Sequence, residues 1–195
     1  TMSLPPGHRL PEFQTVYPTY DNYARSILSA LASRFDDPVL VDVGANVGDT
    51  TLMALNSHES WQVVAVEGSP EFLDYLRRNT AEHQTRVTLV PAFVDCSSSS
   101  GLTYSSNGST GGFSPDRYST NTTPVVSVEQ IWPAVGGFTV WKSDTDGLDL
   151  PIALENWQVL GKADVLWLEW DIALTRGGES LSEQLCEQLR CDGWS

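Results

Sequence analysis

We predict an α/β fold built on a doubly wound, mostly parallel sheet, and three observations lead to this prediction. Compact, β-branched apolar runs recur along the chain, of which Val39 to Val43 is the clearest. Segments with apolar residues at helical spacing lie between these runs. A glycine-bearing turn from Gly44 to Gly48 joins the first run to the next helical segment. Strands buried on both faces read as continuous apolar runs, and their alternation with helices is typical of parallel βαβ units.

Residues 1–18 are rich in proline and lack periodicity, so we expect a surface arm followed by one domain over residues 19–195. Segment 102–123 is rich in serine, asparagine and glycine, which favours a hairpin or a mobile insertion. The other elements are expected in the order helix 21–35, strand 39–43, helix 49–56, strand 62–67, helix 70–83, strand 86–94, strand 138–142, helix 149–160, strand 163–171 and helix 181–190.

The composition limits the classes of partner. A chain of 195 residues with 41% hydrophobic residues suits one globular domain with a substantial core. The net charge of −14 argues against a nucleic-acid partner, because such binding depends on lysine and arginine side chains that neutralise phosphates. No apolar run approaches the length of a membrane span. Three cysteines without a metal-ligand spacing predict reduced thiols and a cytoplasmic protein.

The glycine turn and the acid that ends the next strand predict a nucleoside-cofactor site. Gly44 and Gly48 let the backbone approach a ligand closely, and Glu67 is placed to accept hydrogen bonds from two ribose hydroxyls. A dinucleotide site has a glycine at the middle position of the turn, where this chain has Asn46. The bulk of Asn46 suits a ligand without a pyrophosphate, such as S-adenosylmethionine, better than it suits NAD.

Four blocks of the sequence resemble, in the same order, the signature blocks of the FkbM-type methyltransferases. The blocks are 41–50 (VDVGANVGDT), 66–73 (VEGSPEFL), 124–131 (PVVSVEQI) and 142–149 (KSDTDGLD). The resemblance implies a Rossmann-like domain of the class I methyltransferase type. It also implies S-adenosylmethionine-dependent O-methylation of a small-molecule acceptor, through a hydroxyl on a sugar or a secondary metabolite. In that family the equivalent of Gly193-Trp194 leads into a final strand pair, so we expect this pair to be absent or the C-terminal end to be truncated.

The same blocks contain the residues that we expect to contact the cofactor. Glu67 would bind the ribose, Asp42 would orient the loop or approach the amino group of the methionine part, and Asp95 would reach the adenine amine. The glycine turn would present its backbone. The full set of expected cofactor-binding residues is Asp42, Gly44, Asn46, Gly48, Glu67, Gly68 and Asp95.

Methyl transfer to a hydroxyl requires a base or a metal that assists removal of its proton. Asp144, Asp146 and Asp149 follow strand 138–142 and should lie at the carboxyl edge of the sheet. They match the family's Lys-Ile-Asp-x-Glu-Gly-x-Glu pattern, with Ser143 in place of isoleucine and shorter acids at the last two positions. We predict catalytic roles for Asp144 and Asp146. Acids at a helix N-terminus also offset its dipole, and we favour this capping role for Asp149.

A metal site is a further hypothesis from the carboxylates. Glu169 and Asp171 end the next strand and would lie beside Asp144 if the two strands are neighbours. Oxygen ligands from adjacent strand ends could bind Mg²⁺, which would acidify the hydroxyl. His58 and His83 could serve as bases by their chemistry, but their positions predict surface residues.

Two alternatives to an O-methyltransferase remain open from the sequence. The first is a non-catalytic module on the same fold that binds a cofactor or a partner protein. The second is an NAD-dependent oxidoreductase, which Glu67 favours and Asn46 disfavours.

Overall fold

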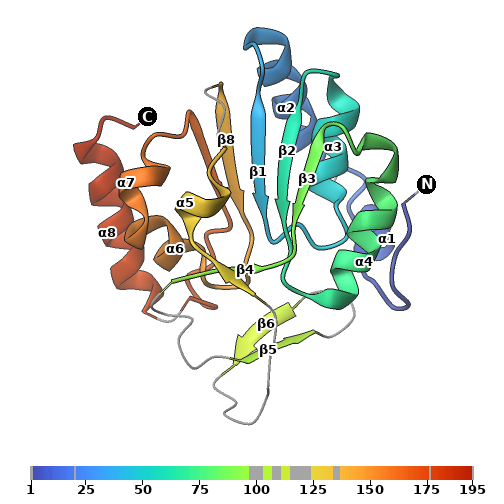
Figure 1. Ribbon diagram of the computed structural model, residues 1–195. Coiled ribbons are helices and arrows are strands. Elements are labelled where there is room, and N and C mark those ends of the chain that lie inside the picture. The colour runs from blue at the N-terminus through green and yellow to red at the C-terminus, as the bar shows by residue number, and fades with distance from the viewer. Residues whose placement is uncertain are drawn as a thin grey trace.

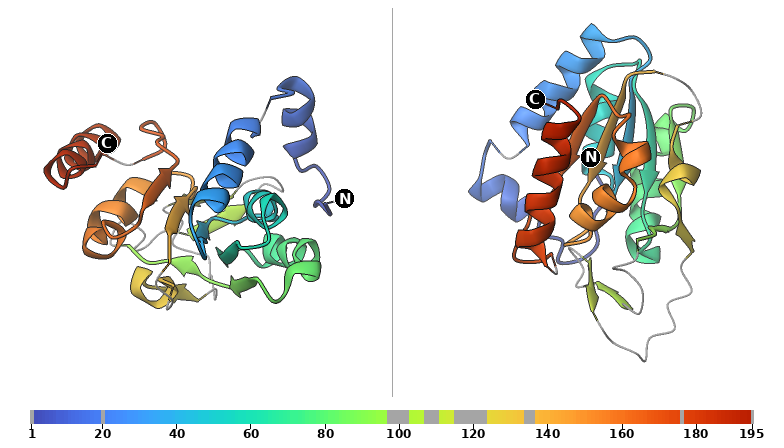
Figure 2. Two further views of the ribbon diagram at one scale, coloured as in Figure 1. Left: turned by 90° about the horizontal axis from the view of Figure 1, so that it is seen from above. Right: turned by 90° about the vertical axis from the view of Figure 1, so that its left-hand side faces the viewer.

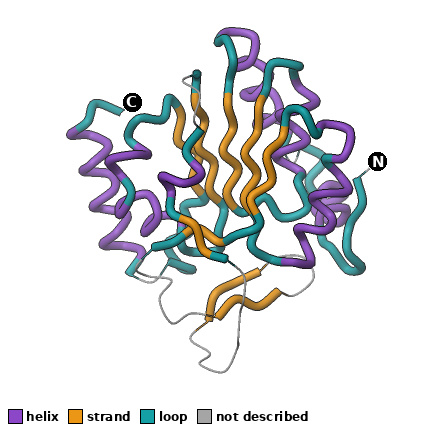
Figure 3. The backbone as a smooth tube through the Cα atoms, viewed as in Figure 1, coloured by secondary structure: helices purple, strands orange, loops and turns teal. Residues whose placement is uncertain are grey.

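The computed structural model describes residues 2–19, 21–96, 103–106, 111–114, 124–133, 137–175 and 177–194. Its main sheet confirms the predicted fold class, a doubly wound α/β arrangement (Figures 1 and 3). All four strand pairings in this sheet are parallel. The strands follow the order β3-β2-β1-β8-β9, and their bounds are β1 Val39–Val43, β2 Gln62–Val66, β3 Val87–Val90, β8 Thr139–Ser143 and β9 Val165–Leu168.

Helices cover both faces of the main sheet (Figure 2). One group belongs to the first half of the chain: α1 Leu10–Val16, α2 Asn22–Arg34, α3 Asp49–Ser57, α4 Pro70–Asn79 and the 3₁₀ turn Ala81–His83. The other group follows the second half: α5 Val128–Ile131, α6 Asp149–Glu155, α7 Trp157–Leu160 and α8 Gly178–Cys191. In α4, Pro70 occupies the first turn, where its missing N–H costs nothing.

Each face of the sheet has its own apolar core, because successive strand residues point to opposite faces. Leu40 and Val140 pack with α2, α3 and α4 in one core, which includes the fully buried Trp61. Val41 and Trp141 pack with α5 to α8 in the other core. The strands are therefore fixed from both sides, and their carboxyl ends meet at one edge of the sheet.

Two small sheets accompany the main one (Figure 1). Strand β4 (Phe93–Val94) pairs in parallel with β7 (Val125–Val126). The hairpin expected within 102–123 is present, since β5 (Thr103–Ser106) pairs antiparallel with β6 (Gly111–Ser114). The rest of that expected insertion lies outside the described residues.

Several predicted boundaries were wrong, each for a local physical reason. Residues 1–18, for which no helix was expected, contain α1, which buries Leu10; the bounds of the arm stay a prediction. The single strand expected over 86–94 ends at Val90, because Pro91 supplies no N–H to a ladder, and the chain then enters a different sheet as β4.

Helical segments also differ from expectation in the second half of the chain. The helix expected over 149–160 is interrupted at Asn156, whose side-chain amide donates to the carbonyl of Ile152. The last helix begins three residues before Leu181, after Gly177 with a φ of 73°. The strand expected over 163–171 is limited to Val165–Leu168. Among the described residues, no helix is both long enough and apolar enough to cross a membrane.

Candidate functional site

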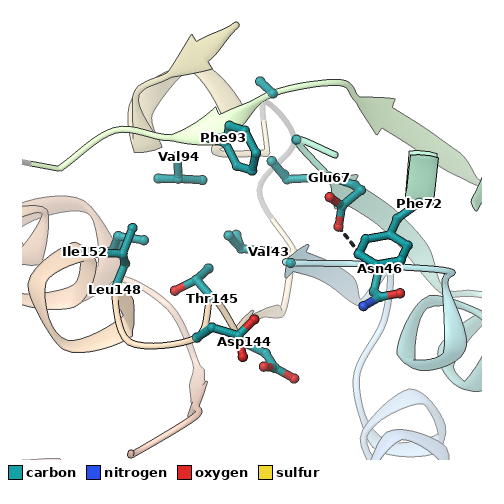
Figure 4. A pocket seen from close by; sticks show the side chains of 15 residues that line it. Val43, Asn46, Glu67, Phe72, Phe93, Val94, Asp144, Thr145, Leu148 and Ile152 are labelled. Carbon is teal, nitrogen blue, oxygen red and sulfur yellow. Dashed lines mark hydrogen bonds between the residues drawn. The ribbon is translucent and has the colours of Figure 1, made fainter. Parts of the chain in front are cut away.

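The carboxyl ends of β1, β2 and β8 border a pocket with about 550 Å³ of empty volume, counted out to its open mouth (Figure 4). We call it the first pocket. Asn46 and Glu67 lie at one end of the pocket and Leu148 and Ile152 at the other, while Phe93 and Val94 supply apolar surface along one edge. Six of the predicted site residues line it together: Gly44, Asn46, Glu67, Gly68, Asp144 and Asp146.

The glycine turn is held against the loop that follows β8. Gly44 has a φ of 72°, and a Cβ there would lie 1.9 Å from the carbonyl oxygen of Asp144. Only glycine therefore fits this close approach of two backbones. Asn46 also adopts the left-handed region, with a φ of 51°, which asparagine tolerates better than most residues. The Nε2 atom of His8 in the N-terminal arm lies 3.3 Å from Oδ1 of Asn46.

Glu67 connects the two loops that form one end of the first pocket. Its Oε2 accepts a hydrogen bond from the backbone N–H of Asn46 at 2.8 Å, and its Oε1 accepts one from Ser69 at 2.6 Å. Burial raises the pKa of Glu67 to about 7, against the opposing effect of these two hydrogen bonds. Each carboxylate oxygen has a second lone-pair site, so the side chain retains capacity for further donors.

Asp42 is buried below the pocket and does not line it. Its Oδ1 lies 3.1 Å from Nζ of Lys142, and its Oδ2 accepts a hydrogen bond from Thr51 at 2.6 Å. Lys142 also donates to the carbonyl of Gly44 at 3.3 Å. Burial disfavours the charge on Lys142, but the carboxylates of Asp42 and Asp144 outweigh it and raise its pKa. Asp42 is thus linked to the glycine turn through Lys142, and both roles expected for it stay predictions.

Two other expected cofactor contacts lie away from the first pocket. A Cβ at Gly48 would meet the side chain of Leu76 at 2.6 Å, so this glycine permits close packing of the turn on α4. Asp95 is exposed and does not line the pocket, and its predicted contact with adenine stays a prediction. At Gly68 a Cβ would lie 2.2 Å from the ring of Phe93, so the aromatic ring covers this residue directly.

A second pocket opens on the other side of Asp144, toward α1 and α2. The two pockets share Gly44, Asn46, Asp144 and Asp146. Burial raises the pKa of Asp21 to about 6, with a further increase from Asp49. Burial, followed by the charge of Asp144, raises the pKa of Glu169 to about 8. The second pocket therefore brings together carboxyl groups that resist ionisation.

The predicted Mg²⁺ site does not fit the observed geometry. The Oδ1 of Asp171 accepts hydrogen bonds from the backbone N–H groups of Ala173 and Leu174, at 2.8 and 3.0 Å, so it is engaged in its own turn. Glu169 lies close enough to Asp144 for their charges to interact. Within the described part of the chain, no group of three or more histidine, cysteine, aspartate or glutamate side chains is arranged to bind a metal ion.

The remaining acids after β8 have different environments. Asp149 is buried in the first turn of α6, where it accepts hydrogen bonds from the Ser143 hydroxyl and from the Thr145 backbone. These donors precede α6, so Asp149 does not cap an N–H group of the helix through them, and its expected capping role stays a prediction. Asp146 lines both pockets and has a φ of 52°. The Asp144 side chain is 51% exposed and lies 3.6 Å from Lys142, at the junction of the two pockets.

Comparison with known proteins gives fold-level similarities. Neither family models nor curated proteins match this sequence. Among solved structures, a precorrin-6y C5,15-methyltransferase from Geobacter metallireducens gives a TM-score of 0.49 at 19% identity, over 88% of this chain and 70% of that one. A putative rRNA methylase from Clostridium thermocellum gives 0.49 at 7%, over 85% and 78%. A putative O-methyltransferase from Klebsiella pneumoniae gives 0.40 at 13%, over 79% and 51%.

These similarities are too distant to assign a reaction. The three proteins are named for methylation of different acceptors, and none of them distinguishes the FkbM type from other methyltransferases.

Sequence reasoning missed several residues of the two pockets. His8 and Tyr17 reach the second pocket from the arm, where no periodicity predicts structure. Phe93 lies beside Gly68 through β4, which belongs to a separate sheet. The sequence did contain a signal for Lys142, because a lysine within a buried strand requires an acidic partner nearby.

Proposed function

We propose that this protein is an S-adenosylmethionine-dependent O-methyltransferase of the FkbM type, acting on a hydroxyl of a sugar or a secondary metabolite. The observation that carries the proposal is Glu67, a buried carboxylate at the end of β2 that holds the glycine turn and faces the first pocket. A carboxylate in this position suits the two hydroxyls of a ribose. The resemblance of the four sequence blocks supports the same cofactor.

The first pocket fits the parts of that cofactor. Glu67 would bind the ribose, and Phe93, Val94 and Ile152 would pack against the adenine. The turn at Gly44 and Asn46 would bind the methionine part through its backbone. When bound, S-adenosylmethionine supplies an electrophilic methyl group on a positively charged sulfur.

Asp144 is the candidate base for the acceptor hydroxyl. Its carboxylate is half exposed where the two pockets meet, so it can contact an acceptor in the second pocket. A base at hydrogen-bond distance from the hydroxyl takes up its proton as the methyl group is transferred. Lys142 lies on its inner side, with its Nζ atom 3.6 Å from Oδ2 of the aspartate. Asp146, which also lines both pockets, is a second candidate for contact with the acceptor.

Calorimetric titration with S-adenosylhomocysteine, and separately with NAD, tests the cofactor. We expect micromolar binding of the first and none of the second, and expect Glu67→Ala to lose at least tenfold in affinity. Binding of NAD alone would favour an oxidoreductase. Binding of S-adenosylhomocysteine without methyl transfer to any hydroxylated acceptor would favour a non-catalytic module.

A further inference from the structure

We propose that His8 is a positioning residue for the cofactor site, and that segment 2–8, which we call the strap, takes part in cofactor binding through it. This inference rests on the proposed function and extends it to a part of the chain that does not line the first pocket. The strap is far from the glycine turn in sequence. Two side chains, those of Asn79 and His8, nevertheless connect the strap to that turn.

Asn79 holds one end of the strap and the glycine turn together. It is the last residue of α4, and its Nδ2 donates to the backbone carbonyls of Ser3 at 2.9 Å and of Val47 at 2.7 Å. Its Oδ1 accepts a hydrogen bond from the backbone N–H of Ser3 at 2.7 Å. Both N–H donors and the acceptor of the amide are therefore engaged. Because Val47 lies within the turn from Gly44 to Gly48, this end of the strap is tied directly to the turn.

His8 connects the other end of the strap to the same turn. Its Nδ1 accepts a hydrogen bond from the backbone N–H of Leu10 at 3.2 Å, so the proton of the neutral ring is on Nε2. That Nε2 lies 3.3 Å from Oδ1 of Asn46 and donates to it. The imidazole also meets the ring of Phe72 edge-on, with centroids 6.4 Å apart. Asn46 and Phe72 both line the first pocket (Figure 4), so His8 supports two residues of its wall.

The backbone of Asn46 makes this support important. Its φ of 51° is a conformation that a residue other than glycine keeps when the surrounding structure holds it. The backbone N–H of Asn46 donates to Oε2 of Glu67, and its side chain accepts the hydrogen bond from His8. The strap and the carboxylate proposed to bind the ribose therefore hold the same residue from two sides. Loss of the His8 donor removes one of these constraints on the turn that would bind the methionine part.

The strap has little buried surface of its own. Among its seven residues only Pro5 is buried, and the two hydrogen bonds between Ser3 and Asn79 are exposed to solvent. Segments of this kind open at a low cost in free energy. Attachment of the strap and binding of the cofactor are linked equilibria, so whatever factor the strap adds to the affinity, the bound cofactor adds to attachment of the strap. Cofactor binding should therefore protect the strap from opening.

Two substitutions distinguish the two nitrogens of His8. Glutamine places an amide nitrogen near the position of Nε2 and keeps the donor to Asn46, whereas the shorter asparagine loses it. We expect His8→Asn to weaken binding of S-adenosylhomocysteine about fivefold, as for one neutral hydrogen bond, and His8→Gln to stay within about twofold of the unchanged protein. His58→Asn, at an exposed histidine, is the matched control and should leave the affinity unchanged. Calorimetry measures these affinities.

Hydrogen exchange of the full chain, followed by mass spectrometry of residues 2–10, measures the reciprocal effect. We expect saturating S-adenosylhomocysteine to slow this exchange about fivefold in the unchanged protein and in His8→Gln, and less than twofold in His8→Asn. Asn79→Asp keeps the acceptor for Ser3 but removes both donors, so it should speed exchange of the strap and weaken binding. Asn56→Asp, at an exposed asparagine, should do neither.

The outcomes separate this inference from the proposed function. Unchanged affinity in both His8→Asn and Asn79→Asp would overturn the inference, and an equal loss in His8→Asn and His8→Gln would overturn the role of Nε2 as a donor. If S-adenosylhomocysteine binds the unchanged protein without slowing exchange of the strap, only this inference fails. If S-adenosylhomocysteine does not bind the unchanged protein, the proposed cofactor fails, and the positioning role fails with it.

Discussion

The Nζ atom of Lys142 lies 3.1 Å from Oδ1 of Asp42, and both side chains are almost fully buried. The two residues are register partners on the neighbouring strands β8 and β1. Thr51 donates a hydrogen bond to Asp42, and the carbonyl of Gly44 accepts one from Lys142. The pair thereby ties two strands, α3 and the glycine turn together. Burying two charges is costly, and these extra hydrogen bonds help to offset the cost.

Removing the lysine should therefore destabilise the fold strongly. Lys142→Met leaves Asp42 buried without its counter-charge, and we expect the free energy of unfolding to fall by about 3 kcal/mol. Urea denaturation followed by circular dichroism measures this change. Lys162→Met, at an exposed lysine, is the control and should change stability by less than about 0.5 kcal/mol. A double variant Asp42→Asn/Lys142→Met should recover part of the loss, and a loss below about 1 kcal/mol in the single variant would contradict this role of the pair.

The turn at Gly44 should be intolerant of any side chain. In Gly44→Ala the new Cβ would meet the carbonyl oxygen of Asp144 at 1.9 Å, so the two loops must separate. We expect the affinity for S-adenosylhomocysteine to fall at least tenfold, measured by calorimetry. Gly193→Ala is a matched control, because Gly193 has a similar φ of 75° and a Cβ added there would meet no atom within 4 Å. It should lose roughly 1–2 kcal/mol of stability at most and keep its affinity. Equal losses of affinity in both variants would mean that backbone strain, and not the clash, is responsible.

Stability should fall as the pH rises, because burial raises the pKa of Glu67 from 4.5 to about 7. Between these values the folded state binds more protons than the unfolded chain, so raising the pH favours unfolding. The contribution of Glu67 is roughly 3 kcal/mol, lost between about pH 4.5 and pH 7. Denaturant titrations from pH 4.5 to 8 test this, and Glu67→Gln should show a shallower slope over that interval. Asp21 and Glu169 shift in the same direction, so some slope should persist in the variant. An identical slope in both proteins would refute the assignment to Glu67.

Asp144 should be required for methyl transfer but not for cofactor binding. We expect Asp144→Asn to reduce transfer of a labelled methyl group at least 100-fold, because the amide cannot accept the proton of the hydroxyl. Calorimetry should show that the affinity for S-adenosylhomocysteine changes less than threefold. Asp146→Asn is the informative comparison, since asparagine tolerates the φ of 52° at that position. A larger loss of transfer in Asp146→Asn than in Asp144→Asn would move the catalytic role to Asp146.

The parallel sheet and the assembly of the first pocket could be predicted because both follow from local patterns. Val39 to Val43 is apolar throughout except for Asp42, as a strand buried on both faces requires, and its five residues are all buried. Gly44 and Glu67 each follow one of two neighbouring parallel strands, which end at the same edge of the sheet. The two residues were therefore expected to lie close together, and both line the first pocket.

The parts that could not be predicted depend on long-range packing. His8 approaches Asn46 from an arm that has no periodic signal. Phe93 covers Gly68 because the chain leaves the main sheet after Val90. The sequence of the expected strand 86–94 does not reveal this change of sheet. Asp171 was predicted to bind a metal, but its Oδ1 accepts two backbone hydrogen bonds within a local turn. The order of the strands alone does not predict these hydrogen bonds.

The small sheet of β4 and β7 has a consequence for how this domain can vary. The backbone N–H of Phe93 donates to the carbonyl of Pro124, and that of Asp95 donates to the carbonyl of Val126. These two hydrogen bonds hold Phe93, which lines the first pocket, against β7. The segment that connects β4 to β7 begins and ends beside these two hydrogen bonds. Its length and composition can therefore diverge between relatives, or be replaced in a chimaera, while the main sheet and Glu67 retain their positions. Under the proposed function, grafting an alternative connection between Asp95 and Pro124 would test whether this segment is needed for methyl transfer.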